Sequence, residues 1–293
     1  MTSPVVLLTG AQGFTGRYMK AALEAAGYRV HGWGNEARGP GVEAVDITDR
    51  PAVFEALSRL RPDYVVHLAA ISFVAHGDAA AIYNVNVLGT RNLLEGLAQL
   101  EHRPTQVLLA SSANVYGETA GAIAESAPFH PQNDYAVSKV AMEYMARLWH
   151  RRLPIVIVRP FNYTGVGQDE NFLLPKIVAH FRRREPVIEL GNIDVWRDFN
   201  DVRNVVEIYV RLLSHAAPGE TYNVCTGKET SVREVIASME AISGHAIEVK
   251  VNPAFVRSHE IAHLHGSDAR LEGLIGKLPR FDLLDTLRWM YES

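Results

Sequence analysis

The stretch that most constrains this fold, Thr9-Gly10-Ala11-Gln12-Gly13-Phe14-Thr15-Gly16, lies close to the start of the chain. The apolar residues 5–8 before it indicate a strand buried on both faces, and apolar residues after it recur at helical spacing. A strand, a glycine turn and a helix in this order favour dinucleotide binding. Gly10 would permit the tight turn, Gly13 would let the backbone approach a pyrophosphate, and Gly16 would let the helix pack against the sheet. The spacing is G-x-x-G-x-x-G rather than the ordinary G-x-G-x-x-G.

The composition is that of a globular protein. Its 293 residues, 47% hydrophobic and 21% charged, suffice for one large domain or two closely joined ones. A net charge of −4 argues against a nucleic-acid partner or an acidic membrane surface. Cys225 is the single cysteine, which excludes an internal disulfide and fits a reducing compartment. The sequence shows neither an apolar run long enough to span a membrane nor a signal peptide, so we expect a cytoplasmic protein without nucleic-acid or membrane partners.

The first half of the chain alternates between strand and helix patterns. This alternation predicts an α/β fold, a Rossmann-type doubly wound parallel sheet with helices on both faces. After Pro160 the elements shorten, which predicts a smaller C-terminal α/β substrate lobe. We place an NADP-binding domain at 1–160 and the substrate lobe at 161–293, interleaved with the first. The main expected strands are 5–8, 28–31, 44–47, 64–68, 106–110 and 155–158, and the long helices are 51–60, 79–100 and 134–150.

A tyrosine and a lysine lie four residues apart in Tyr135-Ala136-Val137-Ser138-Lys139, on one face of an expected helix. A neighbouring ammonium group stabilises tyrosinate, so Lys139 is expected to lower the pKa of Tyr135 into a range useful for proton transfer. Taken alone, the pair fits a surface Tyr–Lys contact equally well. Ser112 favours a catalytic site, because it follows an expected strand and places a hydroxyl at the carboxyl edge of the sheet.

Seven motifs occur along the chain in a fixed order. They are Thr9-Gly10-x-x-Gly13-x-x-Gly16, His67-Leu68-Ala69-Ala70, Asn86-Val87-Leu88-Gly89-Thr90, Ser112-Ala113-Asn114-Val115-Tyr116-Gly117, Tyr135-x-x-x-Lys139, Arg159-Pro160-Phe161-Asn162 and Trp196-Arg197-Asp198-Phe199-x-Asp201-Val202. With this set, the chain resembles the extended short-chain dehydrogenase/reductase family over essentially its whole length. Each motif alone is common, but the ordered set is specific. The glycine spacing is the one that extended members carry.

The resemblance implies roles for individual residues. Tyr135 would be the general acid/base, Lys139 would tune its pKa and bind the nicotinamide ribose, and Ser112 would orient the substrate oxygen. Asn86 is as compatible with tying down a helix as with a catalytic duty. The other residues implied to bind the cofactor are Gly10, Gly13, Phe14, Thr15, Gly16, Asp46, Ile47, Leu68, Ala69 and Ala70.

The choice of cofactor depends on the end of the second expected strand. NAD-specific sites place an acidic residue there to hold the ribose 2′-hydroxyl. This chain has Gly34 at that position, and Arg38 or Asn35 would bind a 2′-phosphate. Glu36 leaves NAD(H) open, because a loop shift of one or two residues brings its carboxylate to the ribose. The sequence therefore favours NADP(H).

The resemblance also implies a nucleotide-sugar substrate held by the second lobe. Arg197 and Arg257 would grip its diphosphate, because guanidinium groups bind such oxygens bidentately. Glu260 would hold the nucleoside ribose, and Asn162 would lie near the sugar and diphosphate. Ser112 and Asn114 complete the implied substrate-binding set, for which surface salt bridges and contacts are the alternative.

Within the family, the resemblance is nearest to members that reduce the C4 ketone of GDP-4-keto-6-deoxy-D-mannose to GDP-D-rhamnose, which feeds lipopolysaccharide. Related dehydratases carry a glutamate two residues after the catalytic Ser or Thr, where this chain has Asn114, and an amide cannot act as a general base. The resemblance thus implies an NAD(P)H-dependent GDP-sugar reductase that forms a homodimer through helices 79–100 and 134–150. The alternatives are a GDP-mannose 4,6-dehydratase, another nucleotide-sugar 4-epimerase or reductase, and a non-catalytic NADP-binding regulator.

One motif points elsewhere. His259-Glu260-Ile261-Ala262-His263 matches the zinc-protease pattern H-E-x-x-H. That pattern binds zinc when a helix brings both histidines together with a third ligand. The surrounding residues indicate a loop or a short strand, which would hold the two histidines too far apart. We therefore expect no metal.

Overall fold

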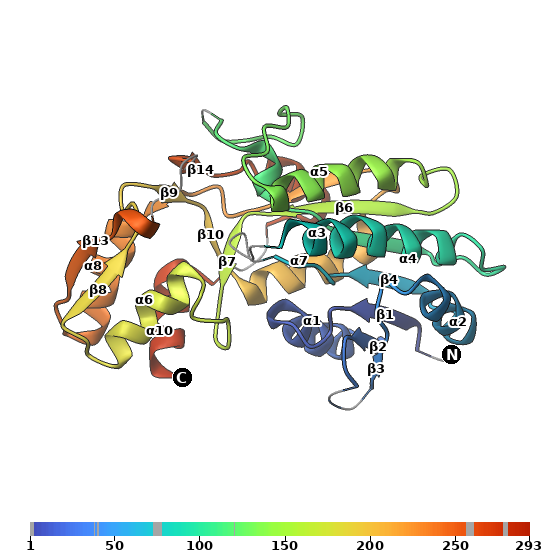
Figure 1. Cartoon of the computed structure of the whole chain (residues 1–293), viewed down its shortest axis with the longest axis horizontal. Helices are drawn as coiled ribbons and strands as arrows, with labels where there is room; N and C mark the ends of the chain where they lie inside the picture. The colour runs from blue at the N-terminus through green and yellow to red at the C-terminus, as the bar shows by residue number, and fades with distance from the viewer. Residues whose placement is uncertain are drawn as a thin grey trace.

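The computed structural model describes residues 3–37, 39, 41–72, 78–119, 121–255, 261–277 and 281–293. In this part of the chain, seven parallel strands form the main sheet in the order β11-β6-β5-β4-β1-β2-β3 (Figure 1). The strands are β1 (Val5–Thr9), β2 (Arg29–Gly34), β3 (Val42–Ala44), β4 (Tyr64–His67), β5 (Gln106–Ala110), β6 (Ile155–Pro160) and β11 (Thr221–Val224). The strand order reverses between β1 and β4, the point where α/β sheets bind ligands. The predicted Rossmann-type α/β fold is confirmed.

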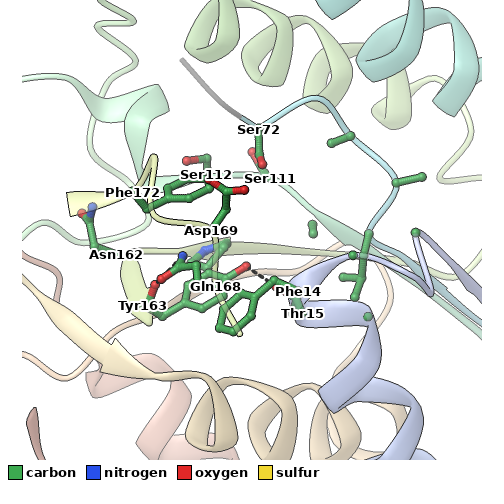
Figure 2. Close-up of a pocket in the computed structure, with 18 of the residues that line it drawn as sticks. Phe14, Thr15, Ser72, Ser111, Ser112, Asn162, Tyr163, Gln168, Asp169 and Phe172 are labelled. Carbon is green, nitrogen blue, oxygen red and sulfur yellow. Dashed lines mark hydrogen bonds between the residues drawn. The ribbon is translucent and has the colours of Figure 1, made fainter. Parts of the chain in front are cut away.

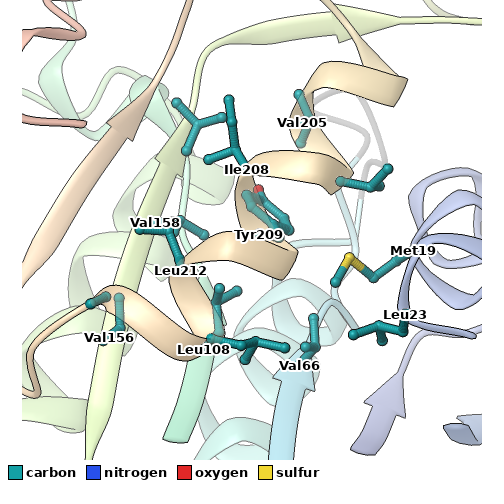
Figure 3. Packing of buried hydrophobic residues seen from close by; sticks show 14 of the residues in the cluster. Met19, Leu23, Val66, Leu108, Val156, Val158, Val205, Ile208, Tyr209 and Leu212 are labelled. Atoms are coloured by element: carbon teal, nitrogen blue, oxygen red, sulfur yellow. The ribbon is translucent and has the colours of Figure 1, made fainter. Parts of the chain in front are cut away.

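Different helices cover the two faces of this sheet. Val6 and Leu8 of β1 belong to the hydrophobic cluster that includes α1 and α7, whereas Leu7 belongs to the cluster with α2, α4 and α5. Figure 3 shows the first cluster, in which Met19 and Leu23 of α1 lie beside the side chains of α7 and of the strands. The helices are α1 (Phe14–Ala25), α2 (Arg50–Leu60), α3 (Ala79–Tyr83), α4 (Thr90–Leu97), α5 (Asp134–Arg147), α7 (Val202–His215) and α9 (Ala269–Ile275). Burial on both faces explains why the central strands are continuously apolar.

The third strand differs from its predicted position. It covers Val42–Ala44, whereas residues 44–47 were expected. Asp46 lies beyond the strand, where its Oδ1 atom accepts hydrogen bonds from the backbone N–H and the hydroxyl of Thr48, both at 2.8 Å. Such a local bond to the backbone favours a turn over continued strand pairing. The strand therefore ends earlier in the chain than expected, at Ala44.

The predicted long helix 79–100 is not a regular α-helix throughout. A π-helical segment, η1 (Asn84–Gly89), lies between α3 and α4. At its centre the buried Asn86 accepts a hydrogen bond from the backbone N–H of Ile71 and donates to the carbonyl of Ile71 and the hydroxyl of Ser138. Wide π turns of this kind are frequent at functional sites. Asn86 thus joins the segment after β4 to α5.

The second half of the chain builds a smaller lobe, on the left of Figure 1, and also returns to the main sheet. Its own cluster packs α6, α8 and α10 around β8 and β13, and a capping box of Ser231 and Glu234 begins α8. The lobe's elements are β7 (Asn162–Thr164), α6 (Leu173–Arg182), β8 (Val187–Leu190), β9 (Trp196–Arg197), β10 (Phe199–Asp201), β12 (Thr230–Ser231), α8 (Val232–Ser243), β13 (Glu248–Val251), η3 (Pro253–Phe255), β14 (His263–Leu264) and α10 (Leu283–Glu292).

Three elements of the second half, α7, β11 and α9, lie with the first. The strand β11 pairs with β6, and Thr221 faces Ile157 in the register. The domain boundary at residue 160 stays a prediction. Within the described residues, no helix is both long and apolar enough to cross a membrane.

Candidate active site

A cavity of about 580 Å³ opens beyond the carboxyl ends of β1, β4 and β5. Its walls come from the glycine turn, the residues after β4 and β5, α5, and the segment that follows β6 (Figure 2). The predicted site residues that line it are Gly10, Gly13, Phe14, Thr15, Gly16, Leu68, Ala69, Ala70, Ser112, Asn114, Tyr135, Lys139 and Asn162. Residues from five separate parts of the sequence thus meet in one hollow.

The glycine turn packs so closely that two of its glycines have no room for a side chain. Gly10 has φ +69°, and a Cβ there would lie 2.8 Å from the backbone nitrogen of Ala69. A Cβ on Gly16 would lie 2.1 Å from the carbonyl oxygen of Gly10. Gly13 precedes α1 and supplies no side-chain cap, so the first amides of the helix are left for a ligand. A helix N-terminus bordering a cavity fits the pyrophosphate of a dinucleotide.

A buried histidine supports the residues opposite this turn. The Nε2 atom of His67 lies 2.8 Å from the hydroxyl of Thr90, which donates to the carbonyl of Asn86, so Nε2 carries the ring proton. Its Nδ1 atom then accepts from Thr9 at 2.7 Å, and the Thr9 hydroxyl accepts from the N–H of Ala69. Burial lowers the pKa of His67 to about 3, so the ring stays neutral. This chain of bonds fixes Ala69 against the glycine turn.

Ser112, Tyr135 and Lys139 meet at the end of β5. The Ser112 hydroxyl lies close enough to Tyr135 to lower its pKa, and it accepts a hydrogen bond from the N–H of Asn114 at 3.2 Å. The Nζ atom of Lys139 donates to the carbonyl of Ala110 at 2.8 Å. All three side chains are largely buried, with exposures of 7%, 7% and 5%. The structure therefore brings together the three predicted catalytic residues.

The expected effect of Lys139 on Tyr135 was wrong. Burial raises the pKa of Tyr135 to about 12, and the hydrogen bond from Ser112 opposes this rise. The Nζ atom of Lys139 lies over the Tyr135 ring, 5.9 Å from the ring centre, and donates its hydrogen bond to the carbonyl of Ala110. Burial also lowers the pKa of Lys139 to about 8, against the attraction of Glu143.

A second cavity lies on the other side of the glycine turn. Asn35, which was expected to bind a 2′-phosphate, lines it together with Gln12, Arg17, Lys20 and Glu36. Gln12 and Arg17 line both cavities, so the two adjoin. The side chain of Gln12 lies over Gly34, where an added Cβ would come within 2.4 Å of Gln12 Oε1. Gln12 therefore fills the position where an NAD-type acid would stand.

Several predicted residues do not line either cavity. Asp46 is engaged with Thr48, and Ile47 is buried beside Gly89. Arg197 donates to the carbonyl groups of Trp196 and Ala262. The structure thus does not bring these three residues into the hollow.

Others lie outside the described residues. These are Arg38, Arg257 and Glu260, together with His259 of the H-E-x-x-H motif. The remaining histidine, His263, stacks on Trp196 with ring centres 4.7 Å apart and pairs with Glu229 at 2.8 Å. In the described ranges, no group of three His, Cys, Asp or Glu side chains is placed to hold a metal ion.

Apart from Asn162, the sequence predicted none of the wall formed by the segment after β6. Tyr163 forms a 2.8 Å hydrogen bond with Thr15 of the glycine turn, shown dashed in Figure 2, and Asp169 and Phe172 also face the cavity. Arg17 holds the same segment through the carbonyl of Gly167 at 2.9 Å. The run from Asn162 to Asp169 carried no local signal for this contact with residues almost 150 positions earlier.

The family model described as the NAD dependent epimerase/dehydratase family matches residues 6–225. The chain belongs to this family. It is therefore an extended short-chain dehydrogenase/reductase, as its ordered motifs implied. The cavity described above lies almost entirely within the matched residues.

Two members of this family are similar along nearly the whole chain. The GDP-6-deoxy-D-talose 4-dehydrogenase of Aggregatibacter actinomycetemcomitans is 37% identical, over 94% of this chain and 92% of that protein. The GDP-6-deoxy-D-mannose reductase of Pseudomonas aeruginosa is 36% identical, over 97% of this chain and 94% of that protein.

Solved structures of the family superpose equally fully. A protein of Burkholderia cenocepacia J2315 has a TM-score of 0.93 at 49% identity and covers 99% of this chain and 97% of its own. The protein RMD of Pseudomonas aeruginosa, solved in complex with NADPH, has a TM-score of 0.88 at 33% identity and covers 99% and 98%.

Proposed function

We propose that this protein reduces the C4 ketone of GDP-4-keto-6-deoxy-D-mannose with NADPH and forms GDP-D-rhamnose. The observation that carries the proposal is the proximity of Tyr135 and Ser112 inside the cavity that the glycine turn also lines. Two adjacent hydroxyl groups suit a carbonyl oxygen, which needs one proton donor and one further hydrogen bond. The names of the two relatives, both of which concern GDP-linked 6-deoxyhexoses, support the substrate class.

The residues of the cavity have distinct tasks in this reaction. NADPH, when bound along the glycine turn, would supply the hydride. Tyr135 would donate its phenolic proton to the C4 oxygen as negative charge develops there, while Ser112 holds the same oxygen. Because burial raises the pKa of Tyr135 to about 12, the phenol keeps its proton at neutral pH. This state supports reduction, since oxidation of an alcohol requires a tyrosinate base at the start.

The cavity offers little for the competing dehydration. That reaction needs a base beside the sugar C5 proton, and Asn114, which lines the cavity at the corresponding place, cannot accept a proton. Among the described lining residues, Asp169 is the carboxylate, and it accepts a hydrogen bond from the backbone of Asn171 at 2.8 Å. It lies on the segment after β6 rather than after β5. The protein should therefore leave GDP-mannose unchanged.

The second cavity supports NADPH over NADH. Gln12 fills the space above Gly34, so no carboxylate faces the ribose from that position. Arg17 and Lys20 line the same cavity and bring positive charge, which suits a 2′-phosphate. Glu36 also lines it, but Gln12 binds the backbone carbonyl of Glu36 at 2.7 Å.

One relative points to a second product. Reduction of the same ketone from its opposite face gives GDP-6-deoxy-D-talose, the C4 epimer, and the talose-named relative is as similar as the mannose-named one. Purified protein incubated with GDP-4-keto-6-deoxy-D-mannose and NADPH should oxidise the cofactor, and NMR of the product identifies the C4 epimer. Turnover of a UDP- or dTDP-linked sugar instead would reject the GDP assignment. Absence of any turnover would favour a binding protein.

We also infer a homodimer formed through α5 and the helices beside it. Four large apolar side chains are exposed there, Leu88 at 52%, Val137 at 39%, Tyr144 at 55% and Leu148 at 80%. Apolar groups gathered on helix faces favour contact with a second protein surface. Light scattering after size exclusion should give twice the mass of the 32.4 kDa chain, and a monomer would reject the dimer.

A further inference from the structure

Three side chains on one face of α5 contact three consecutive residues at the end of β5. Tyr135 lies near the hydroxyl of Ser112, Lys139 donates to the carbonyl of Ala110, and Glu143 accepts a 2.6 Å hydrogen bond from the hydroxyl of Ser111. The three helix residues are spaced by four, so they follow one another along the same face. The backbone that carries Ser112 is therefore held on both sides.

Glu143 is the part of this arrangement that the proposed reaction does not use. It is fully buried and forms an ion pair with Arg159, which is 2% exposed. Its Oε1 atom accepts from Ser111 and from Arg159 Nε at 2.9 Å, and its Oε2 atom accepts from Arg159 Nη2 at 2.7 Å. Both carboxylate oxygens are thus engaged, and neither is available to substrate.

Arg159 connects Glu143 to residues near β11. It donates through Nη1 to the hydroxyl of Tyr116 at 2.7 Å and to the carbonyl of Glu125 at 3.0 Å. The Tyr116 hydroxyl then donates to Asn223 at the end of β11. Burying two charges is costly, and a buried pair of this kind is weak evidence for stability alone. A network that is fully bonded does fix the positions of its members.

We propose that Glu143, paired with Arg159, is a positioning residue that acts through Ser111 to hold the Ser112 hydroxyl against Tyr135. Ser111 lies directly before Ser112, as Figure 2 shows, and its own hydroxyl is committed to Glu143. If this bond is lost, Ser111 loses its side-chain contact with α5, and its backbone keeps the N–H bond to the carbonyl of Val158 at 2.8 Å. Small displacements of a hydroxyl that must meet a reacting oxygen reduce turnover by up to roughly a hundredfold.

The inference rests on the proposed ketone reduction, and Ser111→Ala tests it with the least disturbance. This variant removes one hydroxyl and leaves the Glu143–Arg159 pair intact. The matched control is Thr286→Val, because the Thr286 hydroxyl also donates to a buried carboxylate, Asp201 at 2.7 Å, on α10 away from the cavity. Both variants lose a buried hydrogen bond and should melt at similarly lowered temperatures.

We expect Ser111→Ala to lower kcat by about 10- to 100-fold, while KM for the sugar nucleotide and Kd for NADPH change less than about twofold. Thr286→Val should keep the kcat of the unaltered protein. Equal kcat in Ser111→Ala and the unaltered protein, or an equal fall in both variants, would overturn the inference. Failure of the unaltered protein to turn over the substrate counts against the proposed function only.

Two further measurements extend the test, and the first holds whichever substrate is correct. A crystal structure of Ser111→Ala should show the Ser112 hydroxyl turned away from Tyr135, and an unchanged contact would contradict the positioning role. The double variant Glu143→Leu/Arg159→Met removes both charges of the pair together, so neither is left buried without the other. It should bind NADPH normally and lose kcat at least as strongly as Ser111→Ala. Full activity in the double variant would show that the pair is only structural.

Discussion

The Nζ atom of Lys139 lies 5.9 Å from the centre of the Tyr135 ring and donates its hydrogen bond to a backbone carbonyl instead of the phenol. Both groups are buried, and burial favours the neutral form of each. It therefore raises the pKa of Tyr135 to about 12 and lowers the pKa of Lys139 to about 8. The site therefore holds a neutral phenol beside a cation that is costly to keep charged.

This cost predicts that Lys139→Met is more stable than the unaltered protein at pH 7. The folded-state pKa of Lys139, about 8, lies below its ordinary value near 10.5, so folding is penalised while the lysine must be protonated. The penalty applies fully below pH 8 and disappears as pH rises toward 10.5. At roughly 1.4 kcal/mol per pKa unit, the gain at pH 7 is on the order of 3 kcal/mol. Urea unfolding at pH 7 and pH 10 should show this gain shrinking, and a gain independent of pH would contradict the assignment.

The close packing of the glycine turn predicts that Gly16→Ala loses the cofactor. Its new Cβ would meet backbone atoms, Gly10 O at 2.1 Å and the carbonyl carbon of Ala11 at 2.8 Å, so α1 must move away from the turn. We expect NADPH to bind more than about tenfold more weakly, with a loss of about 1–3 kcal/mol of stability. Gly273→Ala is the control, since its Cβ meets nothing within 4 Å. Titration of nicotinamide fluorescence measures both, and unchanged NADPH affinity in Gly16→Ala would refute the role of the turn.

The second cavity predicts that Lys20→Gln weakens NADPH specifically. A charged hydrogen bond to the 2′-phosphate is worth about 1.5–3 kcal/mol, so Kd for NADPH should rise roughly tenfold or more while Kd for NADH stays the same. Lys250→Gln is the control, because Lys250 lies on β13 in the other lobe and pairs there with Glu248. Equal weakening of both cofactors by Lys20→Gln would place the adenosine ribose elsewhere.

What the sequence predicted correctly is local. The buried strand and the glycine turn each depend on residues a few positions apart, and both are present. The end of β3 was missed because Asp46 bonds to Thr48 and begins a turn. The π segment was missed because Asn86 finds its partners at Ile71 and Ser138, outside its own helix.

In the active site, too, the sequence predicted the residues that depend on local spacing and missed those that depend on distant contacts. Tyr135 and Lys139 share a helix face, so their spacing alone predicts that they lie together. Asp169, Tyr163 and Glu143 reach the site through contacts between distant segments, such as the 2.6 Å bond from Ser111 to Glu143 across 32 residues. No periodicity records such contacts. Arg197, expected at the substrate, bonds instead to the carbonyl groups of Trp196 and Ala262.

The most direct test follows the hydrogen that reaches the sugar. NADPH carrying deuterium at the transferable C4 position, incubated with GDP-4-keto-6-deoxy-D-mannose, should give GDP-D-rhamnose labelled at sugar C4, as read by NMR. Tyr135→Phe should bind NADPH normally yet form this product at least about a hundredfold more slowly, because the proton donor is missing. Label absent from C4, or unaltered turnover by Tyr135→Phe, would contradict a Tyr135-dependent ketone reduction.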